Sequence, residues 1–189
     1  MDTTDKFANQ VIEWITADAD RYRALQVAAE LNLPQWCLGA GFVRNLVWDH
    51  LHFNKPTTPL NDIDLVYFDK RELSAKLDLT YEANLHALMT MPWSVKNQAR
   101  MHERNNDSPY RSTLDAMRYW TEIETAVGVT MKENAELELL APFGVKVLFD
   151  KTISFNARSN NPVDFAKRVA KKQWLKQWQD LKLVPFTST

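Results

Sequence analysis

The stretch CLGAGFVRNLVWDHL, residues 37–51, places two of the chain's four glycines one residue apart. An apolar segment leads into Gly39, and from Gly41 onward apolar residues recur at the spacing of one helix face. Glycine permits backbone turns and close approaches that a side chain forbids, and the first N–H groups of a helix can bind a phosphate. The stretch predicts a strand, a phosphate-binding turn and a helix that ends near Leu51. A turn that only redirects the chain is the alternative.

Two carboxylates, Asp62 and Asp64, open the next apolar segment, DIDLVYFD. Residues two apart in a strand point to the same side of the sheet, so both carboxylates are expected to lie close together. Like charges at that distance repel unless a cation lies between them. Mg²⁺ is commonly held by one or two carboxylates together with substrate phosphates. The pair predicts a magnesium site, and a solvated polar loop end is the alternative.

The rest of the chain alternates between helical and strand patterns. Helices are expected over residues 6–32 (one or two helices), 41–51, 80–91, 112–120 and 162–181. Strands are expected over residues 35–38, 62–69, 93–99, 125–131 and 135–141, the last two as a hairpin. Asp18, Ser112 and Asn161 stand where N-caps are expected. Interleaved strands and helices predict an α/β or α+β fold with a mixed sheet flanked by helices.

Length and composition predict one folded domain over residues 1–189, since 45% of the residues are hydrophobic and seven are tryptophan. A net charge of −1 excludes a global basic field of the kind that attracts nucleic acid. One cysteine, Cys37, excludes an internal disulfide framework and suits a reducing cytoplasm. The acidic N-terminal segment lacks the pattern of a signal peptide, and no apolar run approaches the length of a membrane span. We expect a cytoplasmic protein with no membrane partner.

Three common phosphate-site architectures fit the chain poorly. In Asp-x-Asp phosphatases the nucleophile follows an apolar strand, whereas TTPLN precedes Asp62. None of the four glycines stands directly before a Lys-Ser or Lys-Thr pair, as a Walker loop requires. A dinucleotide fold requires a third glycine at the position of Arg44, although Asp69 stands where its ribose-binding acid is expected. A dinucleotide-binding oxidoreductase remains as a weaker alternative.

The order strand, glycine turn, helix and Asp-x-Asp strand resembles the palm of the polymerase-β nucleotidyltransferase superfamily. The segments GAGFVRN and NDIDLV are similar to motifs of tRNA nucleotidyltransferases. The chain resembles a family of bacterial nucleotidyltransferase-like proteins more closely. The blocks that carry this second resemblance are LGAGFVRNLVWDHLH, TPLNDIDLVYFD, PWSVKNQARMH, TAVGV and APFG, between residues 38 and 144. The resemblance implies a palm-like core over 34–155, between N-terminal helices over 1–33 and a basic helix over 161–182.

The resemblance also implies a reaction in which a hydroxyl acceptor attacks the α-phosphorus of an NTP and pyrophosphate leaves. Asp62 and Asp64 would be the catalytic residues and would hold Mg²⁺ or Mn²⁺. The residues expected to bind the nucleotide are Gly39, Ala40, Gly41, Arg44, Lys96 and Asn97. The acceptor stays open among a small molecule, an RNA end and a protein.

Two positions depart from the superfamily pattern. Asn45 stands where tRNA nucleotidyltransferases have an aspartate, and Ser94 stands at the apparent position of a third carboxylate. Three acids could replace that missing ligand: Glu82, Glu136 and Glu138. A nucleotide-binding or partner-binding module with weak or lost catalysis is therefore the alternative function.

The last expected helix combines a basic surface with two tryptophans one turn apart, Trp174 and Trp178. Its basic residues are Lys167, Arg168, Lys171, Lys172 and Lys176. An amphipathic helix that docks its tryptophans and solvates its lysines explains the pattern. A surface for RNA or nucleotide is the alternative.

Overall fold

The computed structural model of the chain describes residues 3–53 and 57–186. The strands are β1 (Cys37–Gly39), β2 (Ile63–Tyr67), β3 (Trp93–Asn97), β4 (Gly128–Met131), β5 (Leu137–Leu140), β6 (Thr152–Ile153) and β7 (Lys182–Leu183). The α-helices are α1 (Thr3–Ala17), α2 (Ala19–Ala29), α3 (Gly41–Leu51), α4 (Ala75–Leu88), α5 (Met101–Asn105), α6 (Thr113–Met117), α7 (Pro162–Lys172) and α8 (Trp174–Gln177). Short 3₁₀ helices are η1 (Gln98–Arg100), η2 (Val145–Asp150) and η3 (Ala157–Ser159).

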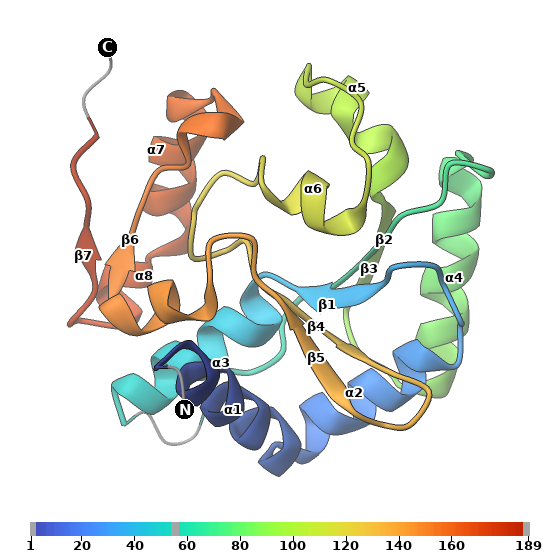
Figure 1. Cartoon of the computed structure of the whole chain (residues 1–189), viewed down its shortest axis with the longest axis horizontal. Helices are drawn as coiled ribbons and strands as arrows, with labels where there is room; N and C mark the ends of the chain where they lie inside the picture. The colour runs from blue at the N-terminus through green and yellow to red at the C-terminus, as the bar shows by residue number, and fades with distance from the viewer. Residues whose placement is uncertain (1–2, 54–56, 187–189) are drawn as a thin grey trace.

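A five-stranded mixed sheet with the order β3-β2-β1-β4-β5 forms the centre of the fold. Strand β1 runs antiparallel to both β2 and β4, whereas β2 and β3 are parallel and β4 and β5 form a hairpin. Helices α1 and α2 lie on one side of this sheet, and α5 and α6 lie on the other (Figure 1). The expected mixed sheet flanked by helices is confirmed.

The main hydrophobic core lies on one face of the sheet. Alternate strand residues such as Leu38, Leu65 and Val95 point into it and are fully buried against α1–α3 and against Leu85 of α4. The opposite face carries the other set of alternate residues and is covered in part by Met117 and Trp120. Because Asp64 belongs to this second set, it lies on the face that the main core leaves open.

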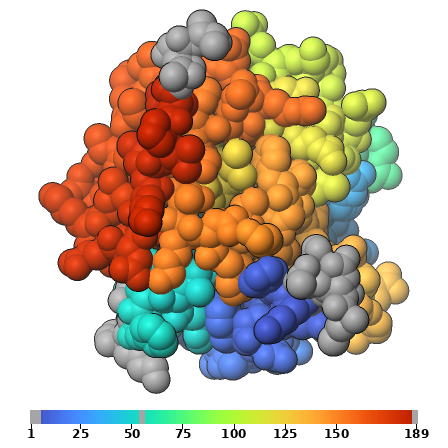
Figure 2. Space-filling view, turned by 60° about the vertical axis from the view of Figure 1, so that its left-hand side comes forward, coloured from blue at the N-terminus to red at the C-terminus, as the bar shows by residue number. Residues whose placement is uncertain are grey.

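A second core joins the C-terminal segments to α3. Trp48 of α3 packs with Phe165, Trp174 and Trp178, and the Asp49 carboxylate accepts a hydrogen bond from Trp178 Nε1 at 2.9 Å. Figure 2 shows the C-terminal segments, in orange and red, directly against the cyan residues of α3. The end of the chain is thereby anchored to the helix that follows the glycine turn.

Several elements occur where their local signals predict them. Helix α3 has the expected bounds, and the β4–β5 hairpin turns at the expected residues. Asp18 caps α2 by accepting from the Arg21 N–H at 3.0 Å. Ser112 caps α6, and Asn161 caps α7 ahead of Pro162. No helix within residues 3–53 and 57–186 is both long and apolar enough to cross a membrane.

Other predicted boundaries are wrong. The last helix is not continuous to residue 181, because Gln173 has a φ of 54° and separates α7 from α8. Helix α4 begins earlier than expected, since Ser74 caps it, and α6 ends at Met117 rather than residue 120. Strand β3 stops at Asn97, whose side chain accepts from Ala99 N–H and starts η1. These boundaries depend on caps and packing that periodicity does not encode.

The residue with the unusual backbone in the glycine turn is Ala40. It has a φ of 55° and a ψ of −121°, a region that residues with a Cβ rarely adopt. Gly39 has a different role, since a Cβ there would lie 3.0 Å from the Trp120 ring, and that ring would have to shift. The turn therefore stores strain at Ala40 and uses Gly39 for close packing.

Replacing Ala40 with glycine should stabilise the fold. Relief of strain worth about 1–3 kcal/mol exceeds the entropic cost of a glycine, about 0.5–1 kcal/mol, so we expect a gain of about 1 kcal/mol. Urea unfolding of Ala40→Gly measures it. The control is Ala166→Gly at an exposed position of α7, where a loss of about 1 kcal/mol is expected. Equal losses at both positions would contradict strain at Ala40.

Candidate active site

The sheet register places Asp64 between a glycine and a serine. Asp64 lies opposite Gly39 on β1 and opposite Ser94 on β3, so the three residues share one face of the sheet. Asp62 is exposed and directly precedes β2. The expectation that the strand of Ser94 neighbours the Asp-x-Asp strand is confirmed.

Asp64 opens into a cavity of about 560 Å³ on this face. The cavity extends from the sheet to α5, to the segment before β4 and to α7, and its wall includes Ala40, Lys96, Arg104, Glu122 and Arg168. It therefore joins one of the two paired carboxylates, the residue before α3 and several basic side chains.

The local field makes the charged form of Asp64 costly. Burial, followed by the neighbouring charge of Asp62, raises the pKa of Asp64 to about 6, although Lys172, Arg44 and Arg168 act in the opposite direction. A cation beside Asp64 would favour its ionised form. The pair is thus chemically suited to a cation.

The N-terminus of α3 begins directly beside this carboxylate. Its N-cap residue, Ala40, has no side chain that could accept a hydrogen bond, and its carbonyl accepts from the N–H groups of Val43 and Arg44 at 3.3 and 3.0 Å. The first N–H groups of a helix have no intrahelical partner, and the helix dipole favours an anion there. This end of α3 can accept an anionic group.

Arg44 is 5% exposed and lies behind the cavity wall. Its guanidinium donates to Thr125 Oγ1 at 2.5 Å and to Asn45 Oδ1 at 2.9 Å, and its Cζ lies 5.0 and 4.6 Å from the ring centroids of Trp48 and Trp174. Burial lowers the pKa of Arg44 to about 10. The structure places this predicted phosphate ligand inside an aromatic cage.

Lys96 and Asn97 point to opposite faces of β3. Lys96 lines the cavity, and its Nζ lies 2.9 Å from Glu82 Oε1. Asn97 is fully buried, and its amide donates to the carbonyl oxygens of Asp69 and Glu72 at 2.7 and 2.8 Å. Of the two, only Lys96 lies at the cavity, whereas Asn97 holds the loop after β2.

The three alternative acids lie away from Asp64. Glu82 accepts from the Val95 N–H at 2.8 Å and from Lys96. Glu136 and Glu138 belong to the β4–β5 hairpin, where both pair with Lys132, and β1 and β4 separate β5 from β2. Ser94 is thus the side chain directly beside Asp64 on β3.

Sequence reasoning missed the pair formed by Glu122 and Arg168. Glu122 is 1% exposed, and its two oxygens accept from Arg168 Nε and Nη2 at 2.6 and 3.1 Å. Both residues line the cavity. The four-residue spacing of Asp164, Arg168 and Lys172 was the available signal, because it puts all three on one helix face.

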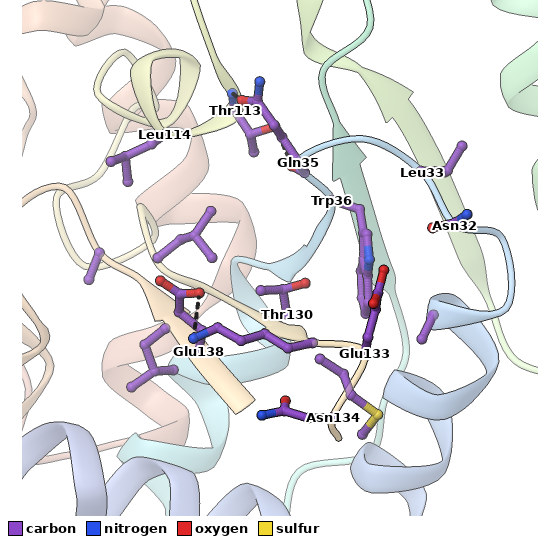
Figure 3. Close-up of a pocket in the computed structure, with 16 residues that line it drawn as sticks. Asn32, Leu33, Gln35, Trp36, Thr113, Leu114, Thr130, Glu133, Asn134 and Glu138 are labelled. Carbon is purple, nitrogen blue, oxygen red and sulfur yellow. Dashed lines mark hydrogen bonds and ion pairs between the residues drawn. The ribbon is translucent and has the colours of Figure 1, made fainter. Parts of the chain in front are cut away.

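A larger cleft of about 1030 Å³ lies beside the β4–β5 hairpin. Trp36, Gln35 and Thr113 come from one side of it and Thr130 and Glu138 from the other (Figure 3). Its lining includes Glu138, one of the alternative acids, but neither carboxylate of the pair and none of the residues expected to bind the nucleotide. The smaller cavity is the better candidate for the active site, because it is lined by Asp64 and basic side chains, and size alone does not provide that chemistry.

Replacing Asp64 with asparagine should stabilise the metal-free protein at neutral pH. Because the folded-state pKa is about 6 against an ordinary 3.8, the contribution of Asp64 to stability is full below pH 3.8 and is lost as the pH rises through 6. We expect a gain on the order of 1–2 kcal/mol at pH 7.5 that shrinks toward pH 4. Urea unfolding in EDTA at both pH values measures it.

Asp69→Asn is the control with the opposite sign. Hydrogen bonds from Arg71 lower the pKa of Asp69 to about 2, so this carboxylate stabilises the fold above pH 3.8 and loses that effect as the pH falls through 2. Its replacement should lower stability at pH 7.5. A neutral-pH loss in Asp64→Asn as well would contradict the electrostatic account of Asp64.

Comparison with solved structures finds the same fold. An NMR structure described as a CCA-adding enzyme head domain has a TM-score of 0.83 and 27% identity, over 94% of this chain and 96% of that one. A CCA-adding enzyme in complex with CTP has a TM-score of 0.57 and 17% identity, over 94% and 43%. A tRNA-processing enzyme complex has a TM-score of 0.55 and 17% identity, over 85% and 43%.

The chain spans less than half the length of the latter two proteins. At 17% identity, the similarity to them shows a shared fold and nothing more. No curated protein sequence matches the chain. The sequence profile of a family described as nucleotidyltransferase matches residues 26–183, most of the chain. By that match, together with the shared fold, the chain belongs to this nucleotidyltransferase family.

Proposed function

We propose that the protein is a Mg²⁺-dependent nucleotidyltransferase that transfers a nucleoside monophosphate from an NTP to a hydroxyl acceptor. The observation that carries the proposal is the position of Asp64, which faces a cavity bordered by the N-terminal end of α3 and by basic side chains. The acceptor stays open among a small molecule, an RNA end and a protein. The proposed location is the cytoplasm, whose reducing conditions suit the single, buried cysteine.

The residues at the cavity fit a magnesium ion. Asp64 at the cavity and Asp62, exposed just before β2, offer carboxylate oxygens, which Mg²⁺ prefers. Burial of Asp64, followed by the charge of Asp62, raises the pKa of Asp64, and a cation beside it would favour its ionised form. Bound Mg²⁺ would neutralise charge that develops on the reacting phosphate. Ser94, directly beside Asp64, offers a hydroxyl oxygen but no negative charge.

The chain's own groups would position the nucleotide. The N-terminus of α3 would bind phosphate oxygens through backbone N–H groups, and Lys96, whose Nζ also contacts Glu82, would add positive charge at the cavity wall. Arg44, caged behind the wall, would act through its field, which already reaches Asp64. Positioning and charge neutralisation account for most of the catalysis in phosphoryl-type transfers.

A catalytically weak nucleotide-binding module is the second candidate. Ser94 in place of an acid favours it, and residues 3–53 and 57–186 contain no cluster of three or more side chains suited to hold a metal. Release of pyrophosphate separates the two candidates, because a binding module would bind NTP with Mg²⁺ without releasing it.

Removing the carboxylate pair should abolish Mg²⁺-dependent nucleotide binding and turnover. Asp62→Asn with Asp64→Asn removes both carboxylates of the proposed metal site. Calorimetry with Mg²⁺ and each NTP measures affinity, and a coupled assay with candidate acceptors measures pyrophosphate. Asp69→Asn, beyond the other end of β2, should behave as wild type. Unchanged Mg²⁺-dependent affinity in the double variant would exclude the pair as the metal site.

Adding a carboxylate at Ser94 should lower the metal concentration that the protein requires. An aspartate directly beside Asp64 would supply the anion that the native site lacks. We expect the Mn²⁺ or Mg²⁺ concentration for half-maximal NTP binding to fall about tenfold in Ser94→Asp. Ser94→Asn, similar in size but uncharged, is the control and should not change it. Equal metal requirements in Ser94→Asp and wild type would show that another position supplies the third ligand.

A further inference from the structure

Two walls of different chemistry border the active-site cavity. The lining residues from α7 and the segment before it are all polar or charged: Ser159, Asn161, Asp164 and Arg168. On the side of α5, the lining includes Met101 of that helix and Tyr119, which follows α6. Helices α5 and α7 lie on either side of α6 in Figure 1. The cavity therefore has one polar wall and one wall with apolar and aromatic surface.

Met101 and Tyr119 form one continuous surface, because both pack against the same small hydrophobic cluster, which contains Phe68 and Tyr110. The Tyr119 ring is tilted by 36° against the Tyr110 ring, at a centroid distance of 5.1 Å. Tyr110 is held in turn by Asp107, whose carboxylate accepts a hydrogen bond from the tyrosine hydroxyl. Met101 and Tyr119 are only half-buried, so this supported surface keeps an accessible part at the cavity.

Arg104 stands beside this surface with its guanidinium uncommitted. It lies three residues after Met101, on the same side of α5, and it is exposed and lines the cavity. The other two basic residues of the lining, Lys96 and Arg168, each contact a carboxylate, at 2.9 and 2.6 Å. Among the residues that the structure describes, Arg104 has no hydrogen bond, ion pair or ring contact. Its planar group is therefore free to contact a ligand.

A tyrosine ring, a thioether and a free guanidinium together suit a nucleobase. Bases stack on aromatic rings and on guanidinium planes, and the polarisable sulfur of methionine contacts aromatic rings favourably. Trp120 is the other aromatic residue of the lining, but its ring lies over Gly39, beside Asp64 on the sheet. That region is the proposed metal and phosphate site, so the aromatic group left for the base is Tyr119.

We propose that Tyr119, Met101 and Arg104 form the binding site for the nucleobase of the NTP. This site rests on the proposed nucleotidyl transfer and specifies which part of the chain holds the base. Tyr119 and Met101 provide the stacking surface. Arg104 adds a planar group whose N–H donors match the acceptor atoms that every base carries. The phosphates then lie toward Asp64 and the N-terminus of α3.

Calorimetry with an NTP and with inorganic tripolyphosphate, each with Mg²⁺, tests the site, because tripolyphosphate carries the phosphates without a base. Tyr119→Ala should weaken NTP binding about tenfold and leave tripolyphosphate binding unchanged. Tyr119→Phe keeps the ring and should bind both probes like wild type. Arg104→Lys keeps the charge but loses the planar group, so it should weaken NTP binding without an effect on tripolyphosphate.

Tyr81→Ala is the matched control. Tyr81 is also a half-buried tyrosine that packs against another tyrosine, Tyr67, but it does not line the cavity. This variant should bind both probes like wild type. Equal weakening of NTP binding in Tyr81→Ala and Tyr119→Ala overturns the site, because the loss then reflects a general loosening of the fold.

The outcomes separate the base site from the proposed reaction. Unchanged NTP affinity in both Tyr119→Ala and Arg104→Lys overturns the base site, even where Asp62→Asn with Asp64→Asn abolishes Mg²⁺-dependent binding and so supports the reaction. Equal weakening of NTP and tripolyphosphate also overturns it, because the residues then act on phosphate. NTP binding that Tyr119→Ala selectively loses, without pyrophosphate release by wild type, supports the base site while the reaction fails. Wild-type protein that binds no NTP overturns both.

Discussion

The region around the candidate site depends on one constraint. The guanidinium of Arg44 is buried, and no carboxylate of the described residues is in hydrogen-bond contact with it. Arg44 belongs to α3, and its partners come from the segment before β4 and from α8. Removing its charge from water is costly, and cation–π contacts with two indoles offset part of that cost, about 2 kcal/mol or more per desolvated pair. Asn45 is neutral, and the nearby charges of Glu122 and Glu124 favour the charged form of Arg44, whose positive charge also acts on Asp64.

The same constraint accounts for the C-terminal architecture. The backbone reversal at Gln173 interrupts the helix immediately before Trp174, and Trp174 and Trp178 then both pack against Trp48. Along α8 the two tryptophans keep a one-turn spacing, with the Trp178 N–H donating to the Trp174 carbonyl oxygen at 2.8 Å, so the break at Gln173 changes their direction relative to α7 and not their spacing. Arg168 of α7 lines the cavity, while Trp174, directly after the break, contacts the guanidinium of Arg44.

Local chemistry made much of the fold predictable from the sequence. The bounds of α3, the β4–β5 hairpin and the caps at Asp18 and Asn161 each rest on neighbouring residues, and each was predicted. The cage around Arg44 and the inward direction of Asn97 depend on segments distant in sequence, so no local pattern reports them. The sequence does not indicate the strained backbone at Ala40, because unusual backbone angles are normally expected at glycine and both neighbours of Ala40 are glycines.

The aromatic cage also imposes an order on how the protein acquires its site. During synthesis the glycine turn and the Asp-x-Asp strand leave the ribosome long before Trp174, yet the guanidinium of Arg44 lacks one of its two indole faces until that residue arrives. Domains fold as units when their contacts become available. A nascent chain that already contains Asp62 and Asp64 still lacks Trp174, so the surroundings of Arg44 beside the candidate site can be completed only after the C-terminal segment has been made.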